Sequence, residues 1–483
     1  MDKMQKTNKK EISIKKAAAI NAGAKYANIG LNLVFSSILA RLLTPNDYGI
    51  VAVITVFTTF FSIFSDMGFG TAVIQNKSLS VEEENHIFTF NSWVALVLAL
   101  FFGIFSYGIA WFYNDSVYIP IGWMLSGVLL FDTLNAIPNA LLLKEKRFIR
   151  VAVRLVVLTI MSNGAAIIFA MLGFKYYAIV ISNLIRAAGS FLWNYFSVNL
   201  KFKLRFEWKS IKKVLGFSGY QFAFSFVNYF SRNLDNLLIG KFLGNVSLGY
   251  YDKAYKLMQY PVGNLTHVIT PVLQPILSDH QDDKNWIYQK YIKIVKLLSI
   301  IGVFISAFCF LAGEEIILIM FGDKWTDAIL CFRFFSLSVW AQMITASTGS
   351  IFQSLGNTKT MFYCGMINSF LTVTAIVLGI TTGSIEQVAL FVAIIYNMHF
   401  VVSFLILMKK AFKLPYLQFL KEIYADILLL VVLIILSVLF PFQIQGLNLL
   451  LRVLIKGCYI VILYGAGLAV TKKYKLFSGL FRN

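Results

Sequence analysis

Residues 21–49 read NAGAKYANIGLNLVFSSILARLLTPNDYG, and residues 221–249 read QFAFSFVNYFSRNLDNLLIGKFLGNVSLG. In each stretch, polar residues three or four positions apart interrupt an apolar run, a spacing that places them on one face of an α-helix. The two stripes are Asn21, Lys25, Asn28, Asn32 and Ser36, and Gln221, Ser225, Asn228, Arg232 and Asn236. Each pair is separated by 200 residues, and the register continues to Gly49 and Gly249. The pattern predicts a duplicated membrane protein whose first and seventh helices turn matching polar faces toward a shared interior.

The composition of the whole chain is that of a membrane protein. Of its 483 residues, 58% are hydrophobic and 14% are charged, whereas soluble domains carry about 25% charged residues. The apolar runs reach the roughly 20 residues that a spanning helix needs, and they lack the period of two that is typical of β-barrel strands. We therefore expect an all-α polytopic protein with about 14 transmembrane helices. The expected spans have centres near residues 29, 58, 100, 129, 161, 186, 228, 262, 304, 339, 369, 396, 432 and 459.

The position of the repeat suggests how these helices are organised. The basic segment 201–213 falls between the two copies and is interpreted as their linker. We expect an N-lobe of six helices over residues 1–200, a C-lobe of six over 201–408, and two further helices over 409–483. Because each lobe has an even number of helices, the copies should be parallel repeats related by an axis along the membrane normal.

The net charge of +20 is distributed unevenly along the chain. Cytoplasmic loops of membrane proteins are enriched in Lys and Arg, and the predicted inner segments carry most of these residues. Predicted outer loops 113–118, 381–387 and 441–448 carry none, although Lys241, Lys253 and Lys256 follow the seventh span. This alternation places both termini in the cytoplasm. The basic residues then serve orientation and contact with anionic lipid, so we expect no nucleic-acid partner.

Polar side chains inside the spans are the candidate functional residues, because a central charge costs about 2.5–3.5 kcal/mol on insertion scales. We expect seven of them to bind substrate in a cavity: Lys25, Asn28, Asn32, Arg154, Arg186, Asn228 and Arg232. Asp66 and Asp235 are the candidates for gating or for coupling to an ion. The cationic excess favours an anionic ligand, above all a phosphate, which Arg can bind with two parallel hydrogen bonds.

Several of these residues allow a purely structural interpretation. Arg232 and Asp235, three residues apart, can form either a structural ion pair or a switchable contact. Arg154 and Arg333 either face the interior or extend toward a membrane surface. Asn135 and Asn139 follow Asp132 at helical spacing and can form hydrogen bonds between helices. Both alternatives stay open for each group.

The sequence offers little sign of an enzyme or a metal site. Its four cysteines and four histidines show no ligand spacing, and no phosphate loop, nucleophile elbow or zinc-helix motif occurs. We therefore expect a protein that is not an enzyme and that binds no cofactor. Transport would be driven by the substrate gradient or coupled to a proton or sodium gradient.

Two groups of motifs resemble a known family. LARLLTPNDYG at residues 39–49, followed after an apolar helix by DMGFG at 66–70, resembles the Wzx-type flippases of the multidrug/oligosaccharidyl-lipid/polysaccharide exporter superfamily. RNLD at 232–235, IGKFLG at 239–244 and LGYY at 248–251 resemble the subgroup that exports colanic-acid-like or teichuronic-acid-like polymers. The resemblance spans the chain in length, helix count and repeat order.

This resemblance implies two six-helix lobes that open alternately to each side of the bacterial cytoplasmic membrane. It implies that the cargo is an undecaprenyl-diphosphate-linked oligosaccharide for cell-surface polysaccharide biosynthesis. Partners would be this lipid, the surrounding membrane lipids and the polysaccharide polymerase or export machinery. The two C-terminal helices would form a groove for the prenyl tail. The alternatives are a cation-coupled multidrug exporter of the same superfamily and a non-transporting scaffold of a polysaccharide synthase complex.

The expected topology can be tested by labelling single cysteines from outside intact cells. Substitutions in predicted outer loops should react, and those in predicted inner segments should not, because a membrane-impermeant reagent reaches only one side. The outer positions are Asp115, Ser384 and Gln445, and the inner positions are Lys146, Lys209 and Lys410. Labelling of the inner set in intact cells would overturn the fourteen-span arrangement.

Overall fold

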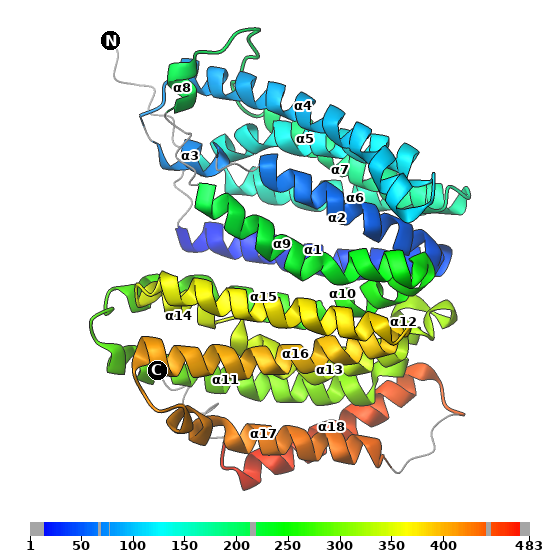
Figure 1. Ribbon diagram of the computed structural model, residues 1–483, viewed down its shortest axis with the longest axis vertical. Helices are drawn as coiled ribbons and strands as arrows, with labels where there is room; N and C mark the ends of the chain where they lie inside the picture. The colour runs from blue at the N-terminus through cyan, green and yellow to red at the C-terminus, as the bar shows by residue number, and fades with distance from the viewer. Residues whose placement is uncertain (1–13, 66–68, 77, 213–218, 441–445, 474–483) are drawn as a thin grey trace. The chain divides into compact units, whose positions relative to one another are not determined.

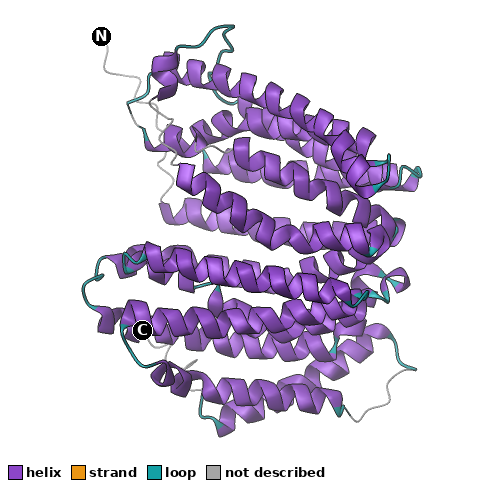
Figure 2. Ribbon diagram, viewed as in Figure 1, coloured by secondary structure: helices purple, strands orange, loops and turns teal. Residues whose placement is uncertain are grey.

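The computed structural model describes residues 14–65, 69–76, 78–212, 219–440 and 446–473. Throughout these ranges the regular secondary structure is helical, and no strand occurs in them (Figure 2). The all-α fold class predicted from the apolar runs is therefore confirmed.

Fourteen helices of the described ranges contain 18 or more residues, and each contains one of the expected span centres. They are α1 (Ile14–Leu42), α2 (Pro45–Ser65), α4 (Val81–Tyr113), α5 (Tyr118–Lys144), α6 (Phe148–Met171), α7 (Tyr176–Tyr195), α9 (Gly219–Phe242), α10 (Gly244–Ser278), α11 (Lys284–Leu311), α13 (Ala328–Thr345), α15 (Thr358–Thr381), α16 (Ile385–Ile406), α17 (Tyr416–Val438) and α18 (Leu449–Val470). Within the described ranges, nine spans are long and apolar enough to cross a membrane by composition alone. The remaining long helices are α1, α7, α9, α10 and α17, whose polar or charged residues reduce their apolar character.

Short helices connect several of the long ones. They are α3 (Phe69–Gln75), α8 (Trp208–Lys212), α12 (Gly313–Phe321), the 3₁₀ turn η1 (Asp323–Trp325), α14 (Thr348–Ser354) and the π-helical turn η2 (Leu407–Phe412).

Local capping residues mark the starts of several long helices. Ser80 precedes α4, and its hydroxyl accepts a hydrogen bond from the Glu83 amide (3.2 Å) while the Glu83 carboxylate accepts one from the Ser80 amide (3.0 Å). Asp283 caps α11 and Asn448 caps α18 in a simpler way, each accepting one backbone amide. Such caps satisfy amides that have no partner within the helix, so the sequence determines where these spans begin.

The chain divides into two compact units. Unit 1 comprises residues 1–43 and 54–226, and unit 2 comprises residues 44–53 and 227–483. In unit 1, α5 packs against α4 and α7, and α6 packs against α1 and α7 (Figure 1). In unit 2, α13 packs against α10, α11 and α16, while α17 and α18 pack against α11. The division into lobes at residues 200 and 408 stays a prediction.

The start of α2, residues 44–49, has a structural role within unit 2. Thr44 and Asp47 form a capping box, in which the Asp47 carboxylate accepts hydrogen bonds from the Thr44 amide (2.9 Å) and hydroxyl (2.7 Å). The next residue, Tyr48, lies 5.5 Å from Trp325 between ring centres, and the Lys253 ammonium is 3.8 Å from the centre of the Tyr48 ring. Lys253 is 6% exposed. The face of the Tyr48 ring therefore provides a cation–π contact for a buried ammonium group.

The two glycines of the repeat register meet at one helix crossing in unit 2. A Cβ built on Gly49 would lie 1.8 Å from the Asn245 carbonyl oxygen, and one built on Gly249 would lie 1.9 Å from the Pro45 carbonyl oxygen. The contact is reciprocal, because Asn245 and Gly249 stand 200 positions after Pro45 and Gly49. Only glycine permits this approach of the two backbones. The spacing read from the sequence thus corresponds to a symmetric contact between the starts of α2 and α10.

Replacing Gly249 by Ala should destabilise this crossing. The added methyl group cannot fit beside the Pro45 carbonyl, and overpacking of this kind costs about 1–3 kcal/mol. Gly164→Ala is the matched control, because a Cβ at that position in α6 meets no atom within 4 Å. Thermal unfolding of the purified proteins in detergent should give a lower melting temperature for Gly249→Ala than for Gly164→Ala. Equal melting temperatures would contradict the close contact.

Candidate functional site

A cluster of amide side chains lies inside unit 1, between α5, α6 and α7. The Asn194 amide nitrogen donates a hydrogen bond to Asn135 Oδ1 at 2.7 Å and makes a longer contact of 3.4 Å with Asn139 Oδ1. The Arg154 guanidinium donates to the same Asn139 oxygen at 3.1 Å. Asn194 is fully buried. Asn135 and Asn139 therefore form hydrogen bonds between helices, and Arg154 takes part in them, while its position relative to the membrane surface stays a prediction.

The first polar stripe, on α1, contacts α6 within unit 1. The Thr159 hydroxyl donates a hydrogen bond to Asn28 Oδ1 at 2.5 Å, and Thr159 itself is 4% exposed. Asn32 is partly buried on the same face of α1, whereas Lys25 is exposed. The stripe on α1 therefore contains both a hydrogen-bonded amide, Asn28, and an exposed cation, Lys25.

Arg186 is, like Lys25, an exposed cation among the predicted site residues of unit 1. It lies exposed on α7, within electrostatic reach of Asp132, which is exposed on α5. Arg154 is bonded to Asn139, whereas no ion pair joins Arg186 to Asp132 among the described residues.

In unit 2, Asp235 forms a different contact from the one that its spacing suggested. The carboxylate is 4% exposed and accepts a hydrogen bond of 2.9 Å from the hydroxyl of Tyr251 on α10, which is fully buried. Arg232 is exposed, and the described residues contain no ion pair between Arg232 and Asp235. The suggested pair is therefore replaced by a tyrosine–carboxylate hydrogen bond. The two residues are close along α9, but one side chain is buried and the other faces outward.

A chain of polar side chains extends from Asp235 along α10. The rings of Tyr251 and Tyr255 are stacked, with 6.2 Å between their centres, and the Tyr255 hydroxyl is 2.7 Å from that of Tyr396 on α16. The Gln259 amide donates to the Tyr255 hydroxyl at 3.1 Å and to Gln342 Oε1 on α13 at 3.2 Å. These contacts link four helices, α9, α10, α13 and α16.

The spacing of three polar residues on α10 is a sequence signal for these hydrogen bonds. Tyr251, Tyr255 and Gln259 are four residues apart, which places them on one face of a helix. Their partners Tyr396 and Gln342 lie far away in the sequence, so spacing alone could not identify them.

Two of the predicted site residues lie outside what the structure describes. Asp66 falls between the described ranges, and the side chain of Asn228 is likewise outside them. Among the described residues, no group of three or more His, Cys, Asp or Glu side chains is placed to hold a metal ion.

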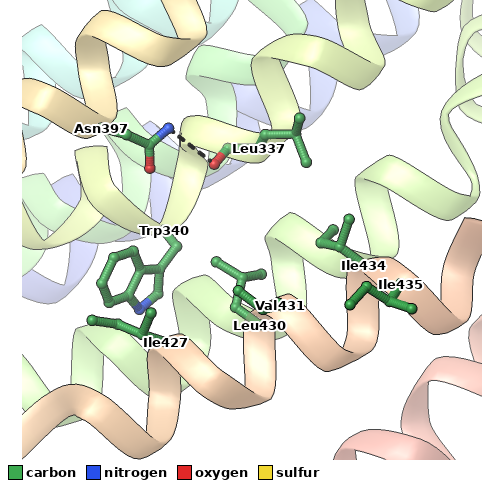
Figure 3. Close-up of a pocket in the computed structure, with 8 residues that line it drawn as sticks. All are labelled: Leu337, Trp340, Asn397, Ile427, Leu430, Val431, Ile434 and Ile435. Carbon is green, nitrogen blue, oxygen red and sulfur yellow. Dashed lines mark hydrogen bonds between the residues drawn. The ribbon is translucent and has the colours of Figure 1, made fainter.

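Unit 2 also contains an apolar cavity of about 320 Å³ that none of the predicted site residues lines. Figure 3 shows its lining, which comes from α13, α16 and α17. The polar contact drawn there is a 3.3 Å hydrogen bond from the Asn397 amide to the Leu337 carbonyl oxygen. Five aliphatic side chains of α17 form one wall: Ile427, Leu430, Val431, Ile434 and Ile435. A cavity of this chemistry suits a hydrocarbon chain better than a sugar.

Comparison with known proteins gives a consistent result. Residues 38–330, more than half of the chain, match the profile of a family described as polysaccharide biosynthesis protein. The teichuronic acid biosynthesis protein TuaB of Bacillus subtilis is 24% identical over 392 residues, which cover 80% of this chain and 81% of that protein. The lipopolysaccharide biosynthesis protein WzxC of Escherichia coli is 23% identical over 411 residues, covering 83% and 84%. The succinoglycan biosynthesis transport protein ExoT of Rhizobium meliloti is 20% identical over 379 residues, covering 77% and 75%.

Solved structures share the fold. The lipid II flippase MurJ in an inward closed conformation superposes with a TM-score of 0.76 at 17% identity, covering 95% of this chain and all of that one. An inward-facing multidrug resistance transporter of the MATE family, in the MOP superfamily, gives a TM-score of 0.61 at 15% identity, covering 78% and 92%. At these identities the likeness establishes the architecture alone, and it agrees with the arrangement of about fourteen membrane helices expected from the sequence.

The contact between Asp235 and Tyr251 predicts different outcomes for two substitutions at position 235. In Asp235→Asn the amide oxygen can still accept the Tyr251 hydroxyl, so the melting temperature in detergent should stay near that of the wild type. In Asp235→Leu the buried hydroxyl loses its partner, a loss of about 1–3 kcal/mol, and the melting temperature should fall. A Leu variant as stable as the Asn variant would show that the hydrogen bond does not stabilise unit 2.

Proposed function

The chain belongs to the polysaccharide biosynthesis protein family, and on that premise we propose that it is a flippase for an undecaprenyl-diphosphate-linked oligosaccharide. It carries this lipid across the bacterial cytoplasmic membrane by alternating access, for the synthesis of a cell-surface polysaccharide. The names of three relatives support the proposal, since they refer to the biosynthesis of teichuronic acid, lipopolysaccharide and succinoglycan, and one of them also to transport.

The observation that carries the proposal is the polar interior of each unit. In unit 1, amide and guanidinium groups from α5, α6 and α7 converge on Asn139 and Asn194. In unit 2, Tyr251 donates a hydrogen bond to Asp235 and stacks on Tyr255, whose hydroxyl is bonded to that of Tyr396 on α16. Polar groups within membrane helices are costly, and they commonly mark a substrate or ion pathway.

The exposed cations are assigned to the headgroup of the substrate. Arg186 in unit 1 and Arg232 in unit 2 each present a planar guanidinium that can bind a phosphate through two hydrogen bonds. Lys25 offers a point charge on the first polar stripe. Arg154 and Asn28 already bond to neighbouring helices, so we assign them to shaping the binding surface and reserve the direct contact with diphosphate for Arg186 and Arg232.

The prenyl tail is assigned to the apolar cavity beside α17. Its wall of aliphatic side chains is continuous along one face of that helix (Figure 3). A sugar headgroup would leave its hydroxyls unpaired there, at a cost of about 1–3 kcal/mol each, whereas a hydrocarbon chain has no groups to satisfy.

Energy coupling is assigned to the acidic residues. Asp235 is a buried carboxylate in a polar chain, and a proton or sodium ion bound there would alter the contact with Tyr251. Asp66 is the second candidate. The variant Asp235→Asn separates a structural role from a coupling role. It should fold normally, because its amide oxygen can still accept the Tyr251 hydroxyl. If Asp235 couples transport to an ion, flipping by this variant should lose its dependence on the membrane gradient.

The cellular setting of the proposal follows from the loop charges and the family. Both termini lie in the cytoplasm, and the polysaccharide polymerase or export machinery works with the flippase on the same lipid. The protein acts as a carrier and makes or breaks no covalent bond.

Transport by the purified protein tests this function. Full-length protein in liposomes should move an undecaprenyl-diphosphate-linked oligosaccharide between leaflets, read by the access of an added glycosidase to the sugar. Movement of a cationic dye without the lipid would favour a multidrug exporter, whose fold is shared. Movement of neither would favour a non-transporting scaffold.

The double variant Arg186→Ala, Arg232→Ala should impair export while inserting normally in the membrane. Both side chains are exposed, so their loss should leave packing intact and remove charge-assisted bonds to the diphosphate. Lys at position 232 should restore export only in part, because an ammonium lacks the planar fork of Arg. Export is measured as surface polysaccharide and insertion as protein abundance in the membrane fraction. Full export by the double variant would remove both residues from the site.

A further inference from the structure

A group of charged side chains gathers at one end of unit 2, where α12 packs against α13 and α18. We call it the α12 charge cluster. Its members are Glu314, Glu315, Arg333, Arg452 and Lys456. On the expected topology this end of the helices lies at the outer face of the membrane, far along the chain from the polar stripes.

Glu315 and Lys456 form the buried centre of the cluster. The Lys456 ammonium is 2.8 Å from both carboxylate oxygens of Glu315 and 3.1 Å from the Leu311 carbonyl oxygen. Glu315 is fully buried, and Arg452 approaches the same carboxylate at 3.4 Å. The charge of Glu315 is thereby neutralised, and these contacts explain how α18 is held against α12.

The charge of Arg333 is not neutralised by a comparably close ion pair. The carboxylate oxygen nearest to it in the cluster belongs to Glu314, 3.5 Å from the guanidinium, which is longer than a good charge-assisted hydrogen bond. Its Nε atom is buried and has no hydrogen-bond partner among the described residues. The stem of the side chain passes over Gly313, where a Cβ would lie 2.8 Å from Arg333 Cγ. Three cations against two carboxylates leave a surplus positive charge.

A cavity of about 310 Å³ opens beside this surplus charge. Arg333 and Lys456 line it together with Ser437, and the rest of the lining is apolar: Phe310, Leu311, Val438 and Phe440. The volume is far larger than the roughly 10–15 Å³ that one water needs. Cationic and apolar surfaces side by side at a membrane face match a molecule with an anionic head and a hydrocarbon chain.

We propose that the cavity beside the α12 charge cluster binds the phosphate-bearing headgroup of an anionic membrane lipid, with Arg333 as its direct partner. The phosphate accepts hydrogen bonds from the Arg333 guanidinium, whose contact with Glu314 is 3.5 Å long, and the hydrocarbon chain begins against Phe310 and Val438. Ordinary anionic phospholipids and polyprenyl phosphates share this chemistry. The site lies apart from the residues assigned to transport, so the inference does not depend on the proposed function.

Photo-cross-linking in nanodiscs tests the site. Phosphatidylglycerol and phosphatidylcholine, each with a diazirine at the same acyl position, are irradiated with the full-length protein, and cross-linked peptides from the ends of α11 and α17 are quantified by mass spectrometry. The wild type should prefer phosphatidylglycerol, and Arg333→Gln should lower this preference about tenfold because the charge-assisted bonds are lost. Lys324→Gln, at an exposed position of η1, is the matched control and should retain it. Equal preferences in the wild type and Arg333→Gln overturn the proposal.

A second variant keeps the test decisive if Arg333→Gln folds poorly. Val438 lines the cavity and is 70% exposed, so Val438→Trp should fold, keep every charge and obstruct the cavity. Labelling of α11 peptides by phosphatidylglycerol should fall, and unchanged labelling counts against the site.

Competition distinguishes the sources of the phosphate. Unlabelled phosphatidylglycerol and undecaprenyl phosphate should each reduce labelling, and the one that acts at the lower concentration is the preferred occupant. Inorganic phosphate at the same concentration should have no effect. Complete displacement by inorganic phosphate would identify a free-anion site and overturn the assignment to a lipid.

Discussion

A polar side chain buried among membrane helices must find its partner within the protein, because no water is at hand to replace it. Unit 1 meets this constraint with amides, since Asn194 contacts Asn135 and Asn139 across helices. Unit 2 meets it with Tyr251, whose hydroxyl bonds to Asp235. These contacts connect neighbouring helices within each unit, and the direct contact with substrate is proposed for exposed cations such as Arg186 and Arg232.

The sequence predicted the helices well because the physics of spanning a membrane is local. A run of about 20 apolar residues suffices to identify a span, and capping residues such as Ser80 and Asp283 mark where a helix begins. The 200-residue register was visible for the same reason, and Gly49 and Gly249 show its structural meaning, since each glycine accommodates the backbone at the start of the other helix.

The partners of the polar residues could not be predicted in the same way. Spacing suggested that Asp235 pairs with Arg232, yet the carboxylate is buried against Tyr251 on the next helix while Arg232 is exposed. Spacing describes one helix at a time, and burial depends on which helices pack together. Arg154 illustrates the same limit, since its partner Asn139 lies on another helix. The sequence thus identified residues of the candidate site without identifying which of them are bonded to each other.

The central claim is that the polar interior serves a lipid-linked oligosaccharide. The most direct measurement deletes the gene in its native host, extracts the membrane lipids and identifies by mass spectrometry what accumulates. The account predicts that an undecaprenyl-diphosphate-linked oligosaccharide accumulates and that the surface polymer is lost. Returning the wild-type gene should restore the normal lipid pool and the polymer. An unchanged lipid pool together with an intact surface polymer would contradict it.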